Sequence, residues 1–97
     1  AQKALLWGMA AIATFGVPLV QVSRTGVAVR LWGQIRAGTG VRSYVVQRKV
    51  GSAWRSFVRG STTVRGFFTA TVRGKAGTRL RLYDPGTRKA GPALVVT

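Results

Sequence analysis

The residues of this 97-residue chain that could do chemistry are its many cations. Sixteen lysines and arginines stand against a single acid, Asp84, which gives a formal net charge of +15. Almost none of these cations can have an acidic partner within the chain. They must sit in water, lie against aromatic faces or meet an anionic partner. Five arginines recur six residues apart, at Arg24, Arg30, Arg36, Arg42 and Arg48. This spread favours a solvated basic face over a dedicated anion site, and it differs from the clustered basic residues of a localisation signal.

The sequence also argues against catalysis. Glycoside hydrolysis uses two carboxylates, and the one carboxylate, Asp84, lies in the turn signal "YDPGT", where it is expected to cap the turn. The absence of His, Cys and Glu from the sequence leaves no residues for a metal cluster or an ordinary catalytic triad. The segments "GTG" and "GKAG" are turn material rather than a phosphate-binding loop. We therefore predict a chain that is not an enzyme and takes no metal or cofactor.

Aromatic residues are the natural candidates for binding. Tyr44 and Trp54 are predicted to lie in the core. Trp32 and Tyr83 fall on strand faces that also carry arginines, where each ring could stack on a sugar or a base or be covered by a guanidinium group. The candidate ligand-binding residues are Trp32, Tyr83, Arg30, Arg36, Arg79 and Arg81.

The elements that position these residues are predicted to be strands. From residue 17 onward apolar and polar residues alternate, as where Leu80 and Leu82 lie opposite Arg79, Arg81 and Tyr83. Turn signals such as "RAGTG" and "DPGTRKAGP" separate the strands, and no helical stretch intervenes. Residues 17–97 are therefore predicted to form an all-β antiparallel sandwich of about seven strands.

Residues 1–16 differ from the rest. Apolar residues recur there at three- and four-residue spacing and predict a short helix that ends at Gly16 and Pro18. Those breaks come before the length of about 20 residues that a membrane span needs, and the segment lacks the cleavage site of a signal peptide. A helix that is apolar nearly all round must be buried by a partner. The predicted assembly or domain contacts are Leu5, Leu6, Met9, Ile12 and Phe15.

Four segments carry a resemblance to a known family: "VRLWGQ" (29–34), "SYVVQRKVGSAW" (43–54), "RGFFTATV" (65–72) and "LRLYDPG" (80–86). Over about residues 20–97 the sequence resembles the C-terminal immunoglobulin/fibronectin-III-like module of secreted actinobacterial glycoside hydrolases. The resemblance implies a secreted, extracellular protein. It also implies that residues 1–16 end a covalently preceding catalytic domain.

Two functions stay open at this point. The first is a non-catalytic accessory or binding module of a secreted carbohydrate-active protein, whose basic surface contacts an anionic cell wall or polysaccharide. The second is a structural subunit of an extracellular, pilin-like filament, with the N-terminal segment buried between identical subunits. Nucleic acid is expected to bind only non-specifically, because the arginines are spread out and no recognisable nucleic-acid-binding motif is present.

Overall fold

The structure is a computed structural model that describes residues 14–97. The predicted helix over residues 1–16 lies outside this range except for its last three residues. The contacts expected of Leu5, Leu6, Met9 and Ile12 therefore stay predictions, as does the filament built on them. Among residues 14–97, no helix is long and apolar enough to cross a membrane.

The described chain forms two antiparallel sheets. The strands of the first sheet are β1 (Val17–Thr25), β2 (Ala28–Gln34) and β5 (Phe67–Arg73). The strands of the second sheet are β3 (Ser43–Val50), β4 (Ala53–Ser61), β6 (Arg79–Asp84), β7 (Lys89–Ala90) and β8 (Leu94–Val95). The strand order is β1-β2-β5 in the first sheet and β4-β3-β6-β7 in the second, with β8 also paired to β6. The predicted all-β antiparallel fold is confirmed.

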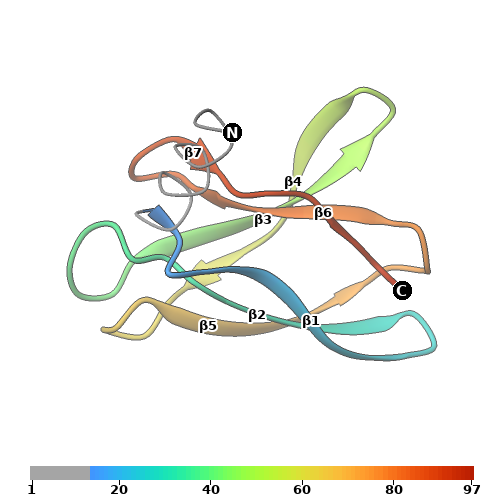
Figure 1. Cartoon of the computed structure of the whole chain (residues 1–97), viewed down its shortest axis with the longest axis horizontal. Helices are drawn as coiled ribbons and strands as arrows, with labels where there is room; N and C mark the ends of the chain where they lie inside the picture. The colour runs from blue at the N-terminus through green and yellow to red at the C-terminus, as the bar shows by residue number, and fades with distance from the viewer. Residues whose placement is uncertain (1–13) are drawn as a thin grey trace, which may run out of the picture.

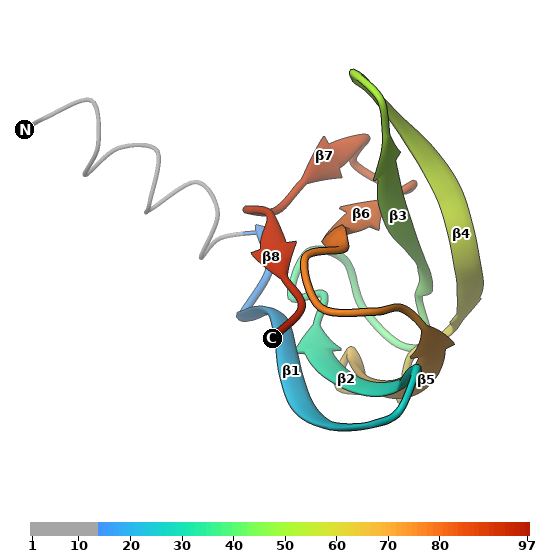
Figure 2. The ribbon, with the colours of Figure 1, turned by 90° about the vertical axis from the view of Figure 1, so that its right-hand side faces the viewer.

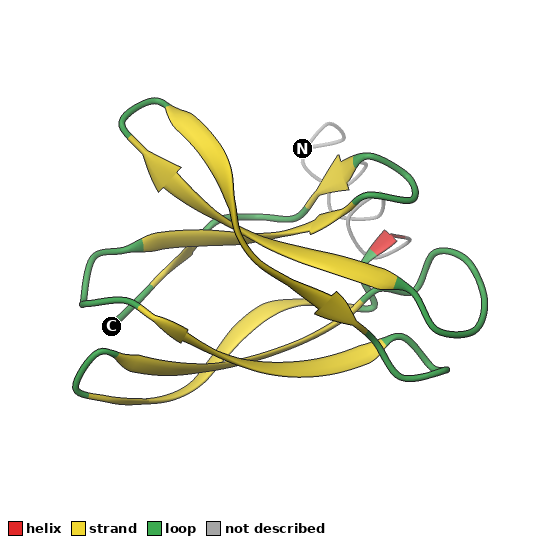
Figure 3. Ribbon diagram, turned by 180° about the vertical axis from the view of Figure 1, so that it is seen from behind, coloured by secondary structure: helices red, strands yellow, loops and turns green. Residues whose placement is uncertain are grey.

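The two sheets pack face to face, as the two layers of Figure 1 and the end-on view of Figure 2 show. Strict alternation along β2 and β6 supplies much of the core between them. In β2, Val29 and Leu31 point inward, and in β6 Leu80 and Leu82 do the same from the opposite sheet. The residues on the other side of each strand form the two outer faces. The loops gather at the two ends of the sandwich (Figure 3).

The segment "DPGTRKAGP", which the sequence predicted to be a turn, contains the additional short strand β7. Both β7 and β8 pair with β6, and Gly91 still donates its backbone N–H to the Leu82 carbonyl at 2.8 Å. The next residue, Pro92, has no N–H to donate, so the ladder is interrupted there. This is why eight strands are found where about seven were expected.

Residues 14 and 15 belong to the sandwich. The Thr14 carbonyl accepts backbone hydrogen bonds from Arg36 at 2.8 Å and Ala37 at 3.2 Å. Phe15 is only 1% exposed and packs in the core cluster. Phe15, which the sequence grouped with the N-terminal contacts, therefore fills the space between the sheets.

The prediction that Tyr44 lies in the core is confirmed. Its ring stacks on Phe68 with ring centroids 3.9 Å apart, which joins β3 of the second sheet to β5 of the first. Gly60 lies opposite Tyr44 on β4, and a Cβ atom at Gly60 would stand 2.7 Å from the Tyr44 hydroxyl oxygen. The absence of a side chain at position 60 gives the Tyr44 ring its room.

Tyr44 makes stability depend on pH in the alkaline range. Burial raises the pKa of the Tyr44 hydroxyl above its ordinary value of 10.0. The folded state thus holds this proton more tightly than the unfolded state. The contribution is complete below pH 10.0 and is lost as the pH rises through the folded-state pKa. We expect the urea unfolding midpoint to fall less steeply above pH 10.0 in Tyr44→Phe than in the original chain. Equal slopes for the two proteins would contradict this assignment.

Candidate functional site

The structure divides the six predicted ligand-binding residues between different parts of the surface. Arg79, Arg81 and Tyr83 alternate with buried residues along β6, and lie together on the outer face of the second sheet. Trp32 and Arg30 lie on the outer face of the first sheet, on β2. Arg36 follows β2 and is exposed at one end of the sandwich. Only the β6 residues are therefore brought together.

Arg81 is the centre of an ordered cluster on this outer face. Its Nε donates a hydrogen bond to the Gln47 Oε1 atom at 2.6 Å, from the directly opposite position on β3. Its guanidinium carbon lies 4.5 Å from the centroid of the Trp54 ring on β4. Arg81 thus reaches from β6 across β3 to β4. We call Arg81, Gln47 and Trp54 the Arg81 cluster. The hydrogen bond and the ring fix the guanidinium group in one orientation.

The prediction that Trp54 lies in the core is wrong. Trp54 is half-buried and pairs with Lys49, which shares the outer side of β3 with Gln47. A register shift between Val46 and Gln47 interrupts the alternation between β3 and β4. Because of this bulge, the sequence of β4 does not show which face Trp54 occupies. The ring is covered by a cation instead of by the core.

The charge of the cluster is not neutralised within the chain. Asp84, the only acid of the sequence, is 4% exposed, and its two carboxylate oxygens accept hydrogen bonds from the Gly86 N–H at 3.0 Å and the Thr87 hydroxyl at 2.7 Å. Burial lowers the pKa of Arg81, and the nearby Tyr83 side chain partly offsets this change. Arginine remains charged at neutral pH despite such a shift. A second cation, the Lys49 Nζ, lies 6.0 Å from the Trp54 ring centroid.

A shallow depression of about 500 Å³ lies on the same face, next to Tyr83. Val45 and Pro85 contribute apolar surface, and the serines contribute hydroxyl groups. Arg59 is the one charged residue among those that line it. The lining residues are Ser43, Tyr44, Val45, Ser56, Arg59, Gly60, Ser61, Tyr83 and Pro85. The depression therefore combines an aromatic ring, hydroxyl groups and one cation.

Trp32 is engaged differently from Trp54. Its ring stacks on Phe67 of the neighbouring strand β5, with centroids 6.0 Å apart and planes within 2° of parallel. The pair lies on the first sheet, on the opposite side of the sandwich from the Arg81 cluster. Trp32 and Tyr83 thus cannot contact one ligand unit together.

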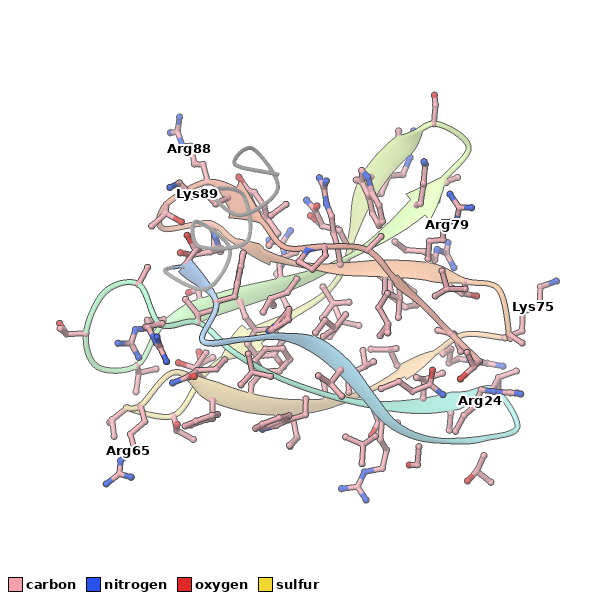
Figure 4. All side chains as sticks on the ribbon, in the orientation of Figure 1. Arg24, Arg65, Lys75, Arg79, Arg88 and Lys89 are labelled. Carbon is pink, nitrogen blue, oxygen red and sulfur yellow. The ribbon has the colours of Figure 1, made fainter. Side chains whose placement is uncertain are left out.

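Several other cations among residues 14–97 serve the fold or point into solvent. Arg42 donates hydrogen bonds to the carbonyl groups of Gly38 and Val64, and so ties together the two loops that precede β3 and β5. Figure 4 shows Arg65, Lys75 and Arg88 extending from separate corners of the sandwich. The dispersed arginines of the sequence are thus dispersed in space as well.

Three residues of this face were missed by reasoning from the sequence: Trp54, Gln47 and Arg59. The one sequence signal for this cluster was the alternation along β6, which predicts that Arg81 lies on an outer face. What Arg81 contacts depends on the register of β3 with β4 and β6, which the sequence pattern does not encode.

This arrangement is suited to binding. The Arg81 cluster presents fixed positive charge, and the depression presents an aromatic ring together with hydroxyl groups. The only carboxylate is buried in a turn. No family model matches this chain, and neither does any curated protein or solved structure.

Proposed function

We propose that this chain is a non-catalytic accessory module of a secreted carbohydrate-active protein, and that it binds anionic polysaccharide through the outer face of the second sheet. The Arg81 cluster is the observation that carries the proposal. Gln47 and Trp54 already hold the guanidinium group of Arg81 in place. Binding a ligand therefore costs little conformational entropy for this side chain.

The strand order supports the fold that this function implies. In the immunoglobulin sandwich the fourth strand joins the sheet of strands one, two and five. Here β4 pairs with β3, so the order is β1-β2-β5 facing β4-β3-β6-β7. This arrangement favours the fibronectin-III-like variant of the sandwich. The outer face of the second sheet is then a strand-built surface rather than a set of loops.

The charge balance supports an anionic ligand. The sequence has sixteen cations and one acid, and the acid is held in a turn. Charges that remain unpaired raise the local concentration of an anionic polymer and speed its association. Because DNA would respond to the same charge, the test must separate polysaccharide from nucleic acid.

Retention on immobilised polygalacturonate, on a neutral glucan and on DNA, each over a range of salt, tests this proposal. We expect retention on polygalacturonate and none on the neutral glucan. Arg81→Gln should weaken polygalacturonate binding about three- to tenfold, since a charge-assisted contact with the ligand is lost. The matched control is Arg30→Gln on the first sheet, which removes the same charge from the other face. Retention by DNA alone, or equal losses in the two variants, would contradict the proposal.

A further inference from the structure

We propose that the depression beside Tyr83 is a subsite for one carboxylated sugar unit, a uronic acid, of the bound polysaccharide. Tyr83 supplies the stacking surface, Arg59 binds the carboxylate, and the serines bind ring hydroxyl groups. This inference rests on the proposed function and adds the class of sugar and the residues that select it.

The strand register sets the dimensions of the subsite. Val45 of β3 pairs with Tyr83 of β6 on one side and with Arg59 of β4 on the other. Neighbouring strands lie about 4.8 Å apart, so Tyr83 and Arg59 flank Val45 at a backbone separation of roughly 10 Å. The width suits one sugar ring over Val45, with Tyr83 at one edge and the flexible Arg59 side chain at the other.

The lining matches a carboxylated sugar better than a phosphate chain. A pyranose has an apolar C–H face that packs on an aromatic ring, and hydroxyl groups that pair with serine side chains. Arg59 is the single cation of the depression, and a guanidinium group can bind one carboxylate through two parallel hydrogen bonds. A polyphosphate backbone carries a charge on every unit and would need several cations at this place.

The subsite also connects with the Arg81 cluster. Ser56 lines the depression and pairs with Gln47, the residue that accepts the hydrogen bond from Arg81. A linear chain with one unit over Val45 can therefore place a neighbouring unit near Arg81. The subsite gives selectivity for the carboxylated unit, and the cluster adds attraction for the rest of the chain.

NMR titration of the chain with trigalacturonate and with its methyl ester tests the subsite, because the ester keeps the rings and removes the charge. We expect Arg59→Gln to lower affinity for the acid about tenfold and to leave affinity for the ester nearly unchanged. Tyr83→Ala should lower affinity for both ligands about tenfold, whereas Tyr83→Phe should retain it because the ring remains. Arg55→Gln, an exposed arginine of β4 outside the depression, is the matched control and should bind as the original chain does.

The outcomes separate this inference from the proposed function. If Arg81→Gln weakens polygalacturonate binding while Arg59→Gln and Tyr83→Ala bind like the original chain, the subsite is wrong and the proposed function stands. A sulfated trisaccharide bound as tightly, with the same dependence on Arg59 and Tyr83, would overturn the assignment of a carboxylate. Failure of the original chain to bind any anionic polysaccharide would overturn both. Urea unfolding of Tyr83→Ala shows whether a loss of affinity arises from misfolding. In that case Tyr83→Leu, which keeps most of the side-chain volume, tests the contribution of the aromatic ring.

Discussion

Replacing Gly66 by alanine is expected to lower the free energy of unfolding by about 3 kcal/mol, or roughly 15 °C in Tm for a domain of this size. Gly66 has a φ of +86°, which a residue with a Cβ atom adopts only with strain. A Cβ at this position would also overlap the backbone carbonyl oxygen of Ile35 and stand 2.7 Å from the Arg42 Nη1 atom. The backbone would have to shift, at the expense of the 2.9 Å hydrogen bond from the Ile35 N–H to the Gly66 carbonyl.

Gly51→Ala is the matched control for this prediction. Gly51 also has a positive φ, +60°, but a Cβ there meets no atom within 4 Å. Its expected cost is the backbone strain alone, about 1 kcal/mol. Thermal and urea unfolding of the two variants separate the cost of backbone strain, which both share, from the cost of steric overlap, which only Gly66→Ala has. Equal losses would mean that the loop before β5 moves freely and does not close against the end of β2.

Replacing Leu82 by alanine is expected to cost about 3 kcal/mol, within the range of about 2 to 5 kcal/mol for buried leucines. Leu82 is fully buried on β6, in the middle of the second sheet. It faces the first sheet, where a Cβ at Gly33 would stand 3.4 Å from the Leu82 Cδ2 atom. Truncation would leave a cavity between the sheets. Urea unfolding measures the loss, and Val64→Ala, at a residue 67% exposed, should change it by less than about 0.5 kcal/mol.

The pair Gly33 and Leu82 allows a sharper test. Gly33→Ala alone should destabilise the fold by about 1 kcal/mol, because its Cβ would lie 3.0 Å from the Phe68 ring. In the Leu82→Ala background the vacated space lets Phe68 move, so the same change should cost less or become favourable. Strict additivity in this double-mutant cycle would show that the two sheets do not meet at these residues.

Strands such as β2, β5 and β6 could be predicted from the sequence because apolar and polar residues alternate along them. Phe68, Ala70 and Val72 share the inner side of β5, and Leu80 and Leu82 share that of β6, as the pattern indicates. Asp84 was expected to cap a turn, and it does so through Gly86 and Thr87. The pattern was less informative in β4, where half-buried residues follow each other without alternation.

The candidate site was predictable only in part. The sequence placed Arg79, Arg81 and Tyr83 on one face, because neighbours two apart on a strand share a side. It also grouped them with Trp32 and Arg30, which the structure places on the other sheet. Which strands share a sheet depends on long-range pairing, and local periodicity carries no record of that pairing.

The sequence by itself determined that this chain is a basic β protein with one carboxylate, since composition and alternation are properties of the chain alone. Only the tertiary structure decided that Arg81 covers Trp54 and that Tyr83 shares a depression with Arg59. These contacts join residues up to 27 positions apart, across strands whose order and register follow from the packing of the whole core. A bulge of one residue on β4, at Phe57, is enough to change which side chains meet on the outer face. For that physical reason the candidate binding face follows from the assembled sheets and not from the local sequence pattern.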